Sequence, residues 1–287
     1  MLFRSKIARN WVRLPLGRFV YDLLDANGNL TQFLAIFEYG LDAADCSAVL
    51  AWANLWHGLG SHAFGPDYNA ALQAVTDRFA TIGASPRKPN GSAINQVRSN
   101  EIQLASPWEL REFKLISNVA GSPTPLTENT VAQTPAFSLQ QTAAISTFVN
   151  ANAAAILANN YVVPLTWNGA PFRGGAAPNQ LQLGWDGPTP VCTSITDPNA
   201  RFSFSVNTCS GCHGTTETGT VFKQVQPRNA GTASQLSGFL TGINGVSDFC
   251  GIQHNFNDID RRRVDLCQLL AKSCTQVNSE PVITFVH

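Results

Sequence analysis

Cys209-Ser210-Gly211-Cys212-His213 is the stretch of this 287-residue chain on which the prediction of its fold depends. Two thiols three residues apart can each add across one vinyl group of the same porphyrin, and the next residue then turns an imidazole toward the iron. Neutral imidazole is an ordinary axial ligand of haem iron. The spacing therefore predicts one covalent haem c, with Cys209 and Cys212 as anchors and His213 as the proximal metal ligand.

The residues around this motif resemble the c-type cytochromes. Asp197-Pro198 is typical of a helix start, with Asp as N-cap and Pro at the first helical position. The run that follows carries Phe204 about one turn before Cys209, and Gly214 follows the motif, as in c-type cytochromes. The resemblance implies a mostly α-helical cytochrome c-like domain over residues 190–287, in which Phe204 is a haem-binding residue.

Other uses of the same five residues are weaker. A thioredoxin-type redox pair is expected near a βαβ pattern, which is not visible here, and it does not need His213. A zinc site could use Cys209 and Cys212, but no second Cys pair or His pair completes four ligands. A plain Cys209–Cys212 disulfide is the alternative that stays open.

The sequence also offers candidates for the sixth ligand, on the side of the iron opposite His213. Met1 is the only methionine, so the His/Met ligation common in small cytochromes is excluded, and His254 is the best candidate for the sixth ligand. His57, His62 and Lys223 are weaker candidates. Arg228 is a candidate partner for a haem propionate, because its guanidinium can form forked hydrogen bonds to a carboxylate.

The first 117 residues predict an α+β domain. Residues 18–24 and 31–39 are aromatic and β-branched runs, and Asn27-Gly28 between them predicts a hairpin. Two helices should follow: one capped by Asp42 or Asp45 with Val49, Trp52 and Trp56 on one face, and one with Tyr68, Leu72, Val75 and Phe79 on one face. Residues 101–104 and 108–116 predict a second pair of strands, so that the sheet has four strands.

Residues 118–189 predict a connector with one helix. Ser138 and Gln141 form a capping box, which should open a helix to about Asn159 with Ile145, Phe148, Val149 and Ile156 inward. Residues 164–198 are rich in Pro, Gly, Asn and Trp without periodicity, and such long irregular stretches are often functional. Further helices are expected at 234–240 and from about Asp258 to Lys272.

Composition narrows the class of protein. The chain carries 19 basic and 19 acidic residues, so no net charge draws it to nucleic acid or to an anionic membrane. Charged residues are only 13%, and amide, hydroxyl and small residues are plentiful, which is more typical of an exported bacterial protein. No transmembrane stretch and no signal peptide are visible. Because haem is attached outside the cytoplasm, a periplasmic or extracellular location with a missing export segment is expected.

Five cysteines lie outside the motif: Cys46, Cys192, Cys250, Cys267 and Cys274. On a helix, Cys267 and Cys274 are about 10 Å apart along the axis, too far for a disulfide. Cys192 and Cys250 should then each pair with one of them and leave Cys46 unbonded. The alternative is that all five are small buried apolar residues.

The chain also resembles a group of uncharacterised exported proteins of myxobacteria and related bacteria. The resemblance covers most of residues 17–270 and includes Trp56-His57-Gly58-Leu59, Pro107–Phe113 and Asn207–Gly214. It implies export and a longer parent chain, and the group has no assigned activity. Gln224 stands where the resembling proteins often have His.

These observations favour covalent haem binding and one-electron transfer with an unidentified redox partner protein. The alternative is an exported binding or structural module in which Cys209 and Cys212 form a disulfide. No G-x-S-x-G, H-E-x-x-H or Walker motif is present, so an electron carrier is expected rather than a catalyst.

Overall fold

The computed structural model describes residues 15–88, 90–101, 108–115, 126–179, 184–220, 224–226 and 232–279. The strands of these segments are β1 (Pro15–Leu24), β2 (Leu30–Gly40), β3 (Ile94–Glu101), β4 (Trp108–Leu115), β5 (Leu126–Asn129), β6 (Thr166–Trp167), β7 (Ala170–Pro171), β8 (Ala177–Asn179), β9 (Ile243–Ser247) and β10 (Gln253–Phe256). The helices are α1 (Cys46–Gly58), α2 (Pro66–Ala80), α3 (Ala143–Ala151), α4 (Ala153–Leu157), α5 (Pro198–Val206), α6 (Cys209–Cys212), α7 (Thr215–Thr218), α8 (Gly238–Thr241), α9 (Asp258–Leu270) and α10 (Cys274–Ser279). Two single turns of 3-10 helix, Leu59–Ser61 and Phe137–Leu139, complete the elements.

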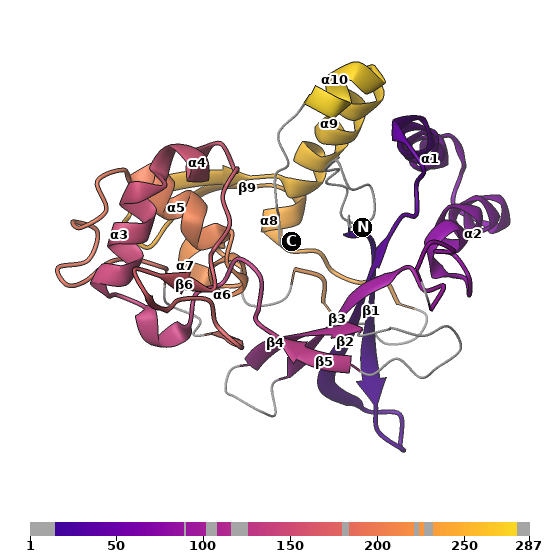
Figure 1. The fold of residues 1–287 in the computed structure, drawn as a ribbon. Coiled ribbons are helices and arrows are strands. Elements are labelled where there is room, and N and C mark those ends of the chain that lie inside the picture. Colours follow the sequence, from indigo (N-terminus) through magenta and orange to yellow (C-terminus); the bar gives the residue numbers. More distant parts are fainter. Residues whose placement is uncertain are drawn as a thin grey trace.

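An antiparallel six-stranded sheet lies below α1 and α2 in Figure 1. Its strands follow the order β1-β2-β3-β4-β5, and β8 pairs with the other end of β4. The β1–β2 hairpin confirms the prediction from Asn27-Gly28. The Asp25 carboxylate accepts the N–H groups of Asn27 and Asn29, each at 2.8 Å, and Gly28 takes a left-handed φ of 82° that suits glycine.

One face of the sheet is aromatic because side chains alternate along a strand. Phe19 and Tyr39 on this face pack against Trp52 of α1 and against Val75 and Phe79 of α2. Both predicted helices are therefore confirmed, and Asp45 caps the first of them through a 2.9 Å bond from the N–H of Ala48. The second predicted pair of strands is only partly right, because β3 ends at Glu101 and residues 102–104 lie outside the described residues.

A second lobe, on the left in Figure 1, holds α3 to α7 around its own core. Ile145, Phe148, Val149 and Ile156 are buried there, as predicted. The predicted helix from Ser138 is wrong in its start and its continuity. Ser138 lies in a 3-10 turn, α3 begins at Ala143, and the chain leaves helical geometry at Asn152 before α4.

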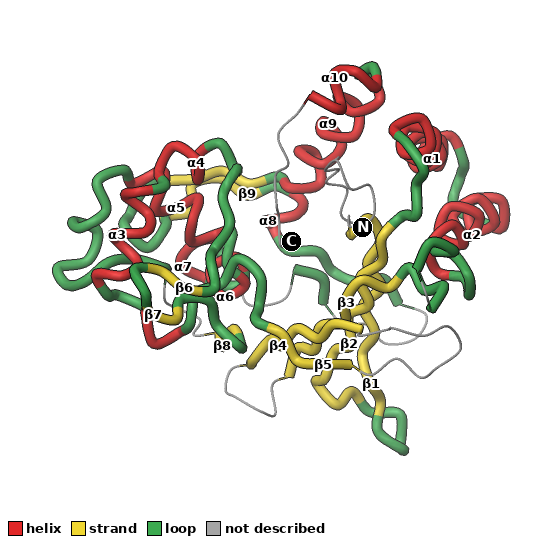
Figure 2. The backbone as a smooth tube through the Cα atoms, viewed as in Figure 1, coloured by secondary structure: helices red, strands yellow, loops and turns green. Residues whose placement is uncertain are grey.

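The C-terminal helices pack against the start of the chain. Helices α9 and α10 lie beside α1, away from the second lobe, in both Figure 1 and Figure 2. A disulfide between Cys46 of α1 and Cys274 of α10 fixes this arrangement. This disulfide and the pairing of β8 with β4 are among the connections that cross the predicted boundaries of residues 1–117, 118–189 and 190–287.

The predicted cytochrome c-like fold is wrong. The dominant element is the antiparallel sheet, and the described part of 190–287 is not a helical bundle around the motif. Its helices α6, α7 and α8 have four residues each, β9 and β10 form a hairpin, and its longest helix, α9, packs on α1 and α8. The predicted helix before the motif is present as α5, but the segments after the motif do not form the helices that the resemblance implied.

Two disulfides are present, and the predicted pairing is wrong. Cys46 pairs with Cys274, and Cys192 pairs with Cys250. Cys267 is exposed on α9 and forms no disulfide, so the prediction that Cys267 and Cys274 do not pair is confirmed. The pairing differed because α10 turns back onto α1, which the sequence spacing could not show.

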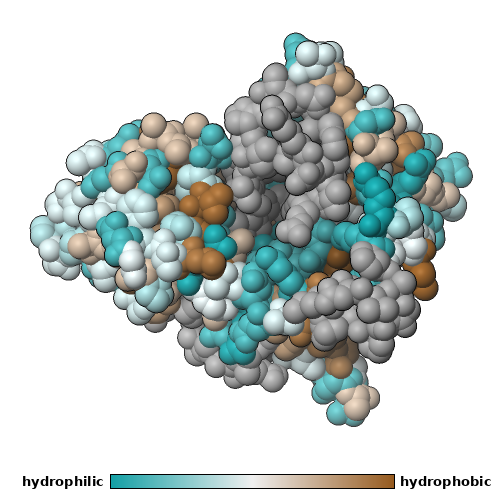
Figure 3. Space-filling model, in the orientation of Figure 1, coloured by the Kyte–Doolittle hydropathy of each residue, from teal (hydrophilic) through white to brown (hydrophobic). Residues whose placement is uncertain are grey.

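The described surface is mixed in character. In the space-filling view of Figure 3, hydrophilic residues (teal) run across the middle of the face turned to the viewer, and hydrophobic residues (brown) form small separate patches. Within the described segments, no helix has both the length and the apolar composition needed to span a lipid bilayer.

Candidate functional site: the cysteine pair and its frame

The Cys-Ser-Gly-Cys run forms the single helical turn α6 directly after α5. Thr208 is its N-cap: its hydroxyl accepts the N–H of Gly211 at 2.9 Å and donates to the carbonyl of Ser205 at 2.7 Å. The side chains of Cys209 and Cys212 are buried, with 0% and 8% exposed. His213 follows at the C-terminal end of the turn and is half-buried. The structure therefore brings the three predicted anchor residues onto one turn.

Cys209 forms no disulfide, so it is not joined to Cys212, in a chain whose seven cysteines are all described. Its backbone N–H donates to the hydroxyl of buried Thr134 at 3.1 Å. Burial raises the pKa of its thiol, and this outweighs the opposing effect of nearby Arg98. A thiol with a raised pKa is a poor nucleophile, which argues against a thioredoxin-type redox cysteine at position 209.

The sheet contributes a charged face near Cys209. Buried Arg98 lies 3.6 Å from a Glu38 oxygen and 3.4 Å from a Glu112 oxygen, and Arg18 pairs with Glu38 from the neighbouring strand. Burial opposes ionisation of Glu38, but the two arginines outweigh it and lower the pKa of this carboxyl group. A buried charge of this kind is costly to leave without its partner. The site therefore has a charged, polar wall on the side of the sheet.

A buried tryptophan holds the middle of the motif. The indole N–H of Trp185 donates to the hydroxyl of Ser210 at 2.9 Å, and its backbone N–H donates to the hydroxyl of Ser205 at 2.8 Å. Trp185 is 1% exposed, so both bonds are shielded from water. Buried hydrogen bonds of this kind fix a position because leaving one unmade costs more than a surface bond does. Trp185 thus ties the loop before α5 to both α5 and α6.

A buried arginine joins the segments before and after the motif. Arg201 of α5 donates to both oxygens of Glu217 in α7, at 2.7 and 3.1 Å, and to Asp248 at 2.8 Å. Arg201 and the two carboxylates are at most 5% exposed. Burial tends to lower the pKa of Arg201, but the two carboxylates outweigh it and raise this pKa. The three charges form one closed network behind the cysteine pair.

His254 belongs to this network. Its Nε2 lies 3.1 Å from Oδ2 of Asp248, the same oxygen that accepts from Arg201, and its ring stacks on Phe202 with 3.5 Å between ring centroids and 5° between planes. In the structure, the candidate sixth ligand therefore contacts Asp248 and stacks on Phe202. Its ligation of iron stays a prediction.

Phe204 is the other predicted haem-binding residue that the structure describes. Phe204 is wholly buried in the core of the second lobe, with its ring 5.8 Å from Phe148 and 6.4 Å from Trp185. It supports α5 from inside this core. Arg228 and Lys223 lie outside the described residues.

Sequence reasoning missed Trp185, Arg201, Glu217 and Asp248, which hold the motif in place. One signal was available for Arg201 and Glu217. They are charged residues close to the motif, Arg201 eight positions before Cys209 and Glu217 four positions after His213, in a chain with only 13% charged residues. Asp248 has no such local signal, because it approaches Arg201 from 47 residues away.

In the part of the chain that the structure describes, the donor atoms of Cys209, Cys212 and His213 are not grouped closely enough to bind a single metal ion. Within the described residues, the one group of three or more ligand atoms lying within 4.8 Å of one another is Asp186, Cys192 and Cys250. The two sulfurs of that group form a disulfide, so it offers no thiolate. Covalent haem needs no such convergence, since the two sulfurs attach to the porphyrin edge and the imidazole binds the central iron. The donor set of Cys209, Cys212 and His213 fits haem attachment better than it fits zinc.

Comparison of the chain with protein-family models, with curated proteins and with solved structures gave no match. The resemblance to exported myxobacterial proteins and the local likeness to c-type cytochromes therefore stay predictions from the sequence.

Proposed function

We propose that this protein attaches one haem c through Cys209 and Cys212, with His213 as proximal ligand, and transfers single electrons outside the cytoplasm. The proposal does not depend on a cytochrome c fold. It depends on the motif, on the helical turn that carries it, and on the state of its first cysteine.

One observation supports the proposal most directly: Cys209 is a thiol. Four other cysteines of the chain are paired in disulfides, yet Cys209 is not bonded to the cysteine three residues away. A protein that forms disulfides is typical of an oxidising compartment, where a thiol at Cys209 beside a second cysteine needs a reason. Covalent attachment of a porphyrin is such a reason, because it requires both sulfurs as thiols.

The chain's own residues have defined tasks in this function. Each thiol would add across one vinyl group, with the sulfur bonded to one vinyl carbon and the hydrogen transferred to the other. His213 would hold the iron from the proximal side, and haem supplies a one-electron iron couple when bound. The frame of Trp185 and Arg201 keeps α6 at a fixed place between α5 and α7.

The test is production of the protein in a periplasm with a haem-attachment system, followed by denaturing mass spectrometry and absorption spectroscopy. We expect the mass of one haem on the intact chain and a Soret band that survives denaturation. Cys209→Ser/Cys212→Ser should lose both signals. Cys267→Ser is the matched control, since it removes another cysteine that forms no disulfide, and it should keep both. A chain without the added mass refutes the proposal.

The sixth ligand has its own prediction. If His254 ligates the iron, the reduced protein is low-spin, and His254→Ala becomes five-coordinate and binds carbon monoxide. This would require His254 to exchange its hydrogen bond with Asp248 for the metal. A variant whose spectrum equals that of the parent leaves His254 in the network where the structure has it, and ligand binding then becomes a better-supported role than electron transfer.

A second function is supported by the polar surroundings of Cys209. The charged face of Arg98, Glu38 and Glu112 is unlike an apolar haem pocket, which favours an exported binding or structural module without haem. In that case Cys209 and Cys212 would join as a disulfide after export. The same mass spectrum decides, because this disulfide removes two hydrogens and adds no haem.

A further inference from the structure

We infer that the Cys192–Cys250 disulfide is a redox control of the cysteine-pair site: closed, it keeps Cys209 buried, and opened by a dithiol reductant, it gives reagents access to this thiol. The biological use of this control rests on the proposed function. Its physical content, the accessibility of Cys209, can be measured in protein that carries no haem.

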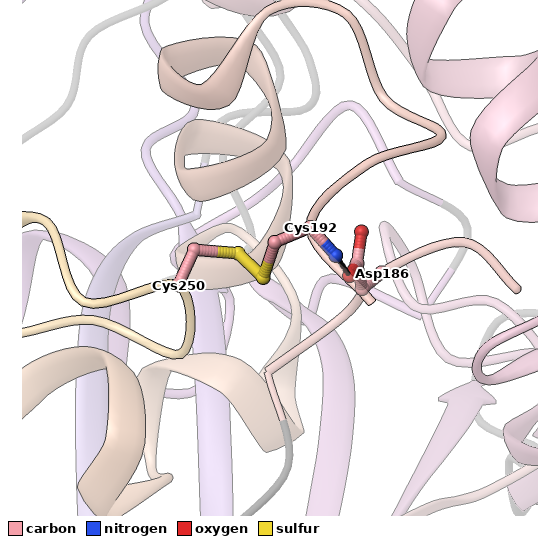
Figure 4. A group of neighbouring side chains, drawn as sticks. All are labelled: Asp186, Cys192 and Cys250. Atoms are coloured by element: carbon pink, nitrogen blue, oxygen red, sulfur yellow. Dashed lines mark hydrogen bonds between the residues drawn. A yellow bond between two sulfur atoms is a disulfide. The ribbon is translucent and has the colours of Figure 1, made fainter. Parts of the chain in front are cut away.

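The first connection runs from Cys192 to the middle of the motif. Figure 4 shows the disulfide beside Asp186, whose carboxylate accepts the backbone N–H of Cys192. Asp186 is wholly buried, and its other oxygen has no hydrogen-bond partner within the described segments. The preceding residue is Trp185, which donates to Ser210 inside the motif. A shift of the Cys192 loop therefore reaches α6 through two adjacent residues.

The second connection runs from Cys250 to the segment after the motif. The N–H groups of Cys250 and Ile252 both donate to one oxygen of Asp248, each at 2.9 Å. The other oxygen of Asp248 accepts from Arg201. Arg201 also donates to both carboxylate oxygens of Glu217. Glu217 lies four residues after His213. The two halves of the disulfide thus hold the motif from both sides.

The backbone at Cys192 is in a conformation that a non-glycine residue rarely adopts. Its φ is +63°, in the left-handed region. Such a conformation persists only where the surroundings hold it, and here the disulfide and the Asp186 carboxylate do so. Opening the disulfide removes one of these two restraints. The loop can then relax, and Asp186 loses the fixed position of its N–H donor.

The chemistry balances with a small dithiol as reductant. The S–S bond between Cys192 and Cys250 breaks, each sulfur gains one electron and one proton, and the two sulfurs of the reductant join as a disulfide. Reoxidation reverses the exchange. Cys209 and Cys212 are not consumed in either direction, so their accessibility reports only on the structure.

The experiment measures the rate at which N-ethylmaleimide labels Cys209 in the haem-free full-length chain, by peptide mass spectrometry. The variant Cys192→Ser/Cys250→Ser lacks the regulating disulfide. Labelling of its Cys209 should be faster by about tenfold or more, since local opening around this residue then breaks fewer contacts. Cys46→Ser/Cys274→Ser is the matched control, in which labelling should stay within about twofold of the parent. The control loses the disulfide that closes the longer loop, so a merely global loss of stability would raise its labelling at least as much.

Exposed Cys267 serves as an internal reference whose labelling should be equal in all forms. If Cys192→Ser/Cys250→Ser unfolds, Trp185→Phe provides the second test, because it keeps the disulfide and removes the indole N–H that bonds to Ser210. Faster labelling of Cys209 in this variant supports the inference. Equal rates in parent, Trp185→Phe and both disulfide variants overturn it. Since no haem is involved, this outcome is separate from failure of the haem test.

Discussion

At the scale of single residues, most of the buried charged side chains in the described residues lie in two groups, the sheet face around Arg98 and the network around Arg201. Removing one member of a buried ion pair leaves its partner charged and unsolvated, which costs far more than loss of a surface pair. Arg201 compensates two carboxylates at once. It is therefore the residue on which the frame behind the motif depends most.

Arg201→Met should destabilise the folded protein by about 3–5 kcal/mol, because Glu217 and Asp248 then lie buried without their cation. Urea denaturation followed by circular dichroism measures the effect. Arg263→Met is the control: Arg263 is exposed and pairs with exposed Asp260, so the cost should be under about 1 kcal/mol. Equal losses in the two variants would contradict the role given to the buried network.

The lowered pKa of Asp248 makes the stability of the folded protein depend on pH. Burial opposes its ionisation, but the N–H of Ile252, His254 and Arg201 outweigh it, so its pKa is lowered in the folded state. A lowered pKa gives stability that is present above the unfolded value of about 4 and is lost as pH falls through the folded pKa. The difference in free energy of unfolding between the parent and Asp248→Asn should therefore be largest at about pH 5–7 and shrink toward about pH 2–3. A gap that is constant over this range, in urea titrations at each pH, would show that Asp248 has no lowered pKa.

At the scale of elements, α6 illustrates how closely two short helices can pack. A Cβ at Gly211 would lie 2.0 Å from the carbonyl oxygen of Ser205 at the end of α5. Backbone atoms cannot move aside as a flexible side chain can. The glycine between the two cysteines is therefore needed for the approach of α6 to α5, besides any role in the spacing of the motif.

Gly211→Ala should destabilise the protein by about 1–3 kcal/mol through this overlap. The urea midpoint is the measurement, and the haem content of the same preparation shows whether the motif is still presented. Gly60→Ala is the control, since a Cβ there meets nothing within 4 Å. It should be neutral or slightly stabilising. A variant at position 211 as stable as that at position 60 would mean that the two helices can separate without cost.

The elements that the sequence could predict are those with local signals. Asn27-Gly28, Asp45 and Asp197 each mark a turn or a helix start by hydrogen bonds to residues two to four positions away. The break at Asn152 has no comparable signal, and the apolar spacing continues through it, so one helix was predicted where two exist. The pairing of β8 with β4 joins residues about 70 positions apart, a separation at which periodicity carries no information.

At the scale of the whole molecule, the predicted fold failed for a related reason. The motif specifies its own turn and the helix before it, both of which are present, but it does not specify what surrounds them. The site is instead enclosed by the sheet of the N-terminal region, by Trp185 and by Asp248, and these residues come from three distant segments. The anchors of the candidate site were predictable, and its frame was not.

The two disulfides should differ in their effect on stability. In the chain-entropy model, closing segments of 228 and 58 residues stabilises a fold by about 5 and about 4 kcal/mol. Cys46→Ser/Cys274→Ser should therefore lower the urea midpoint further than Cys192→Ser/Cys250→Ser does. The comparison uses both variants at the same pH and in the absence of reductant. The opposite order would mean that native contacts around Cys192 outweigh the loop term.

The Cys46–Cys274 bond also changes what a single cut can do to the molecule. It makes a closed covalent ring of everything between the two residues, 228 positions apart in sequence, including β3, β4, β5 and β8 of the sheet, the second lobe and the motif. Hydrolysis of any one peptide bond within this ring opens it without releasing a piece. A nicked chain would keep its full mass until a reductant is added, and would then separate into two. A single broken peptide bond between Cys46 and Cys274 thus changes how the chain is connected and releases no fragment.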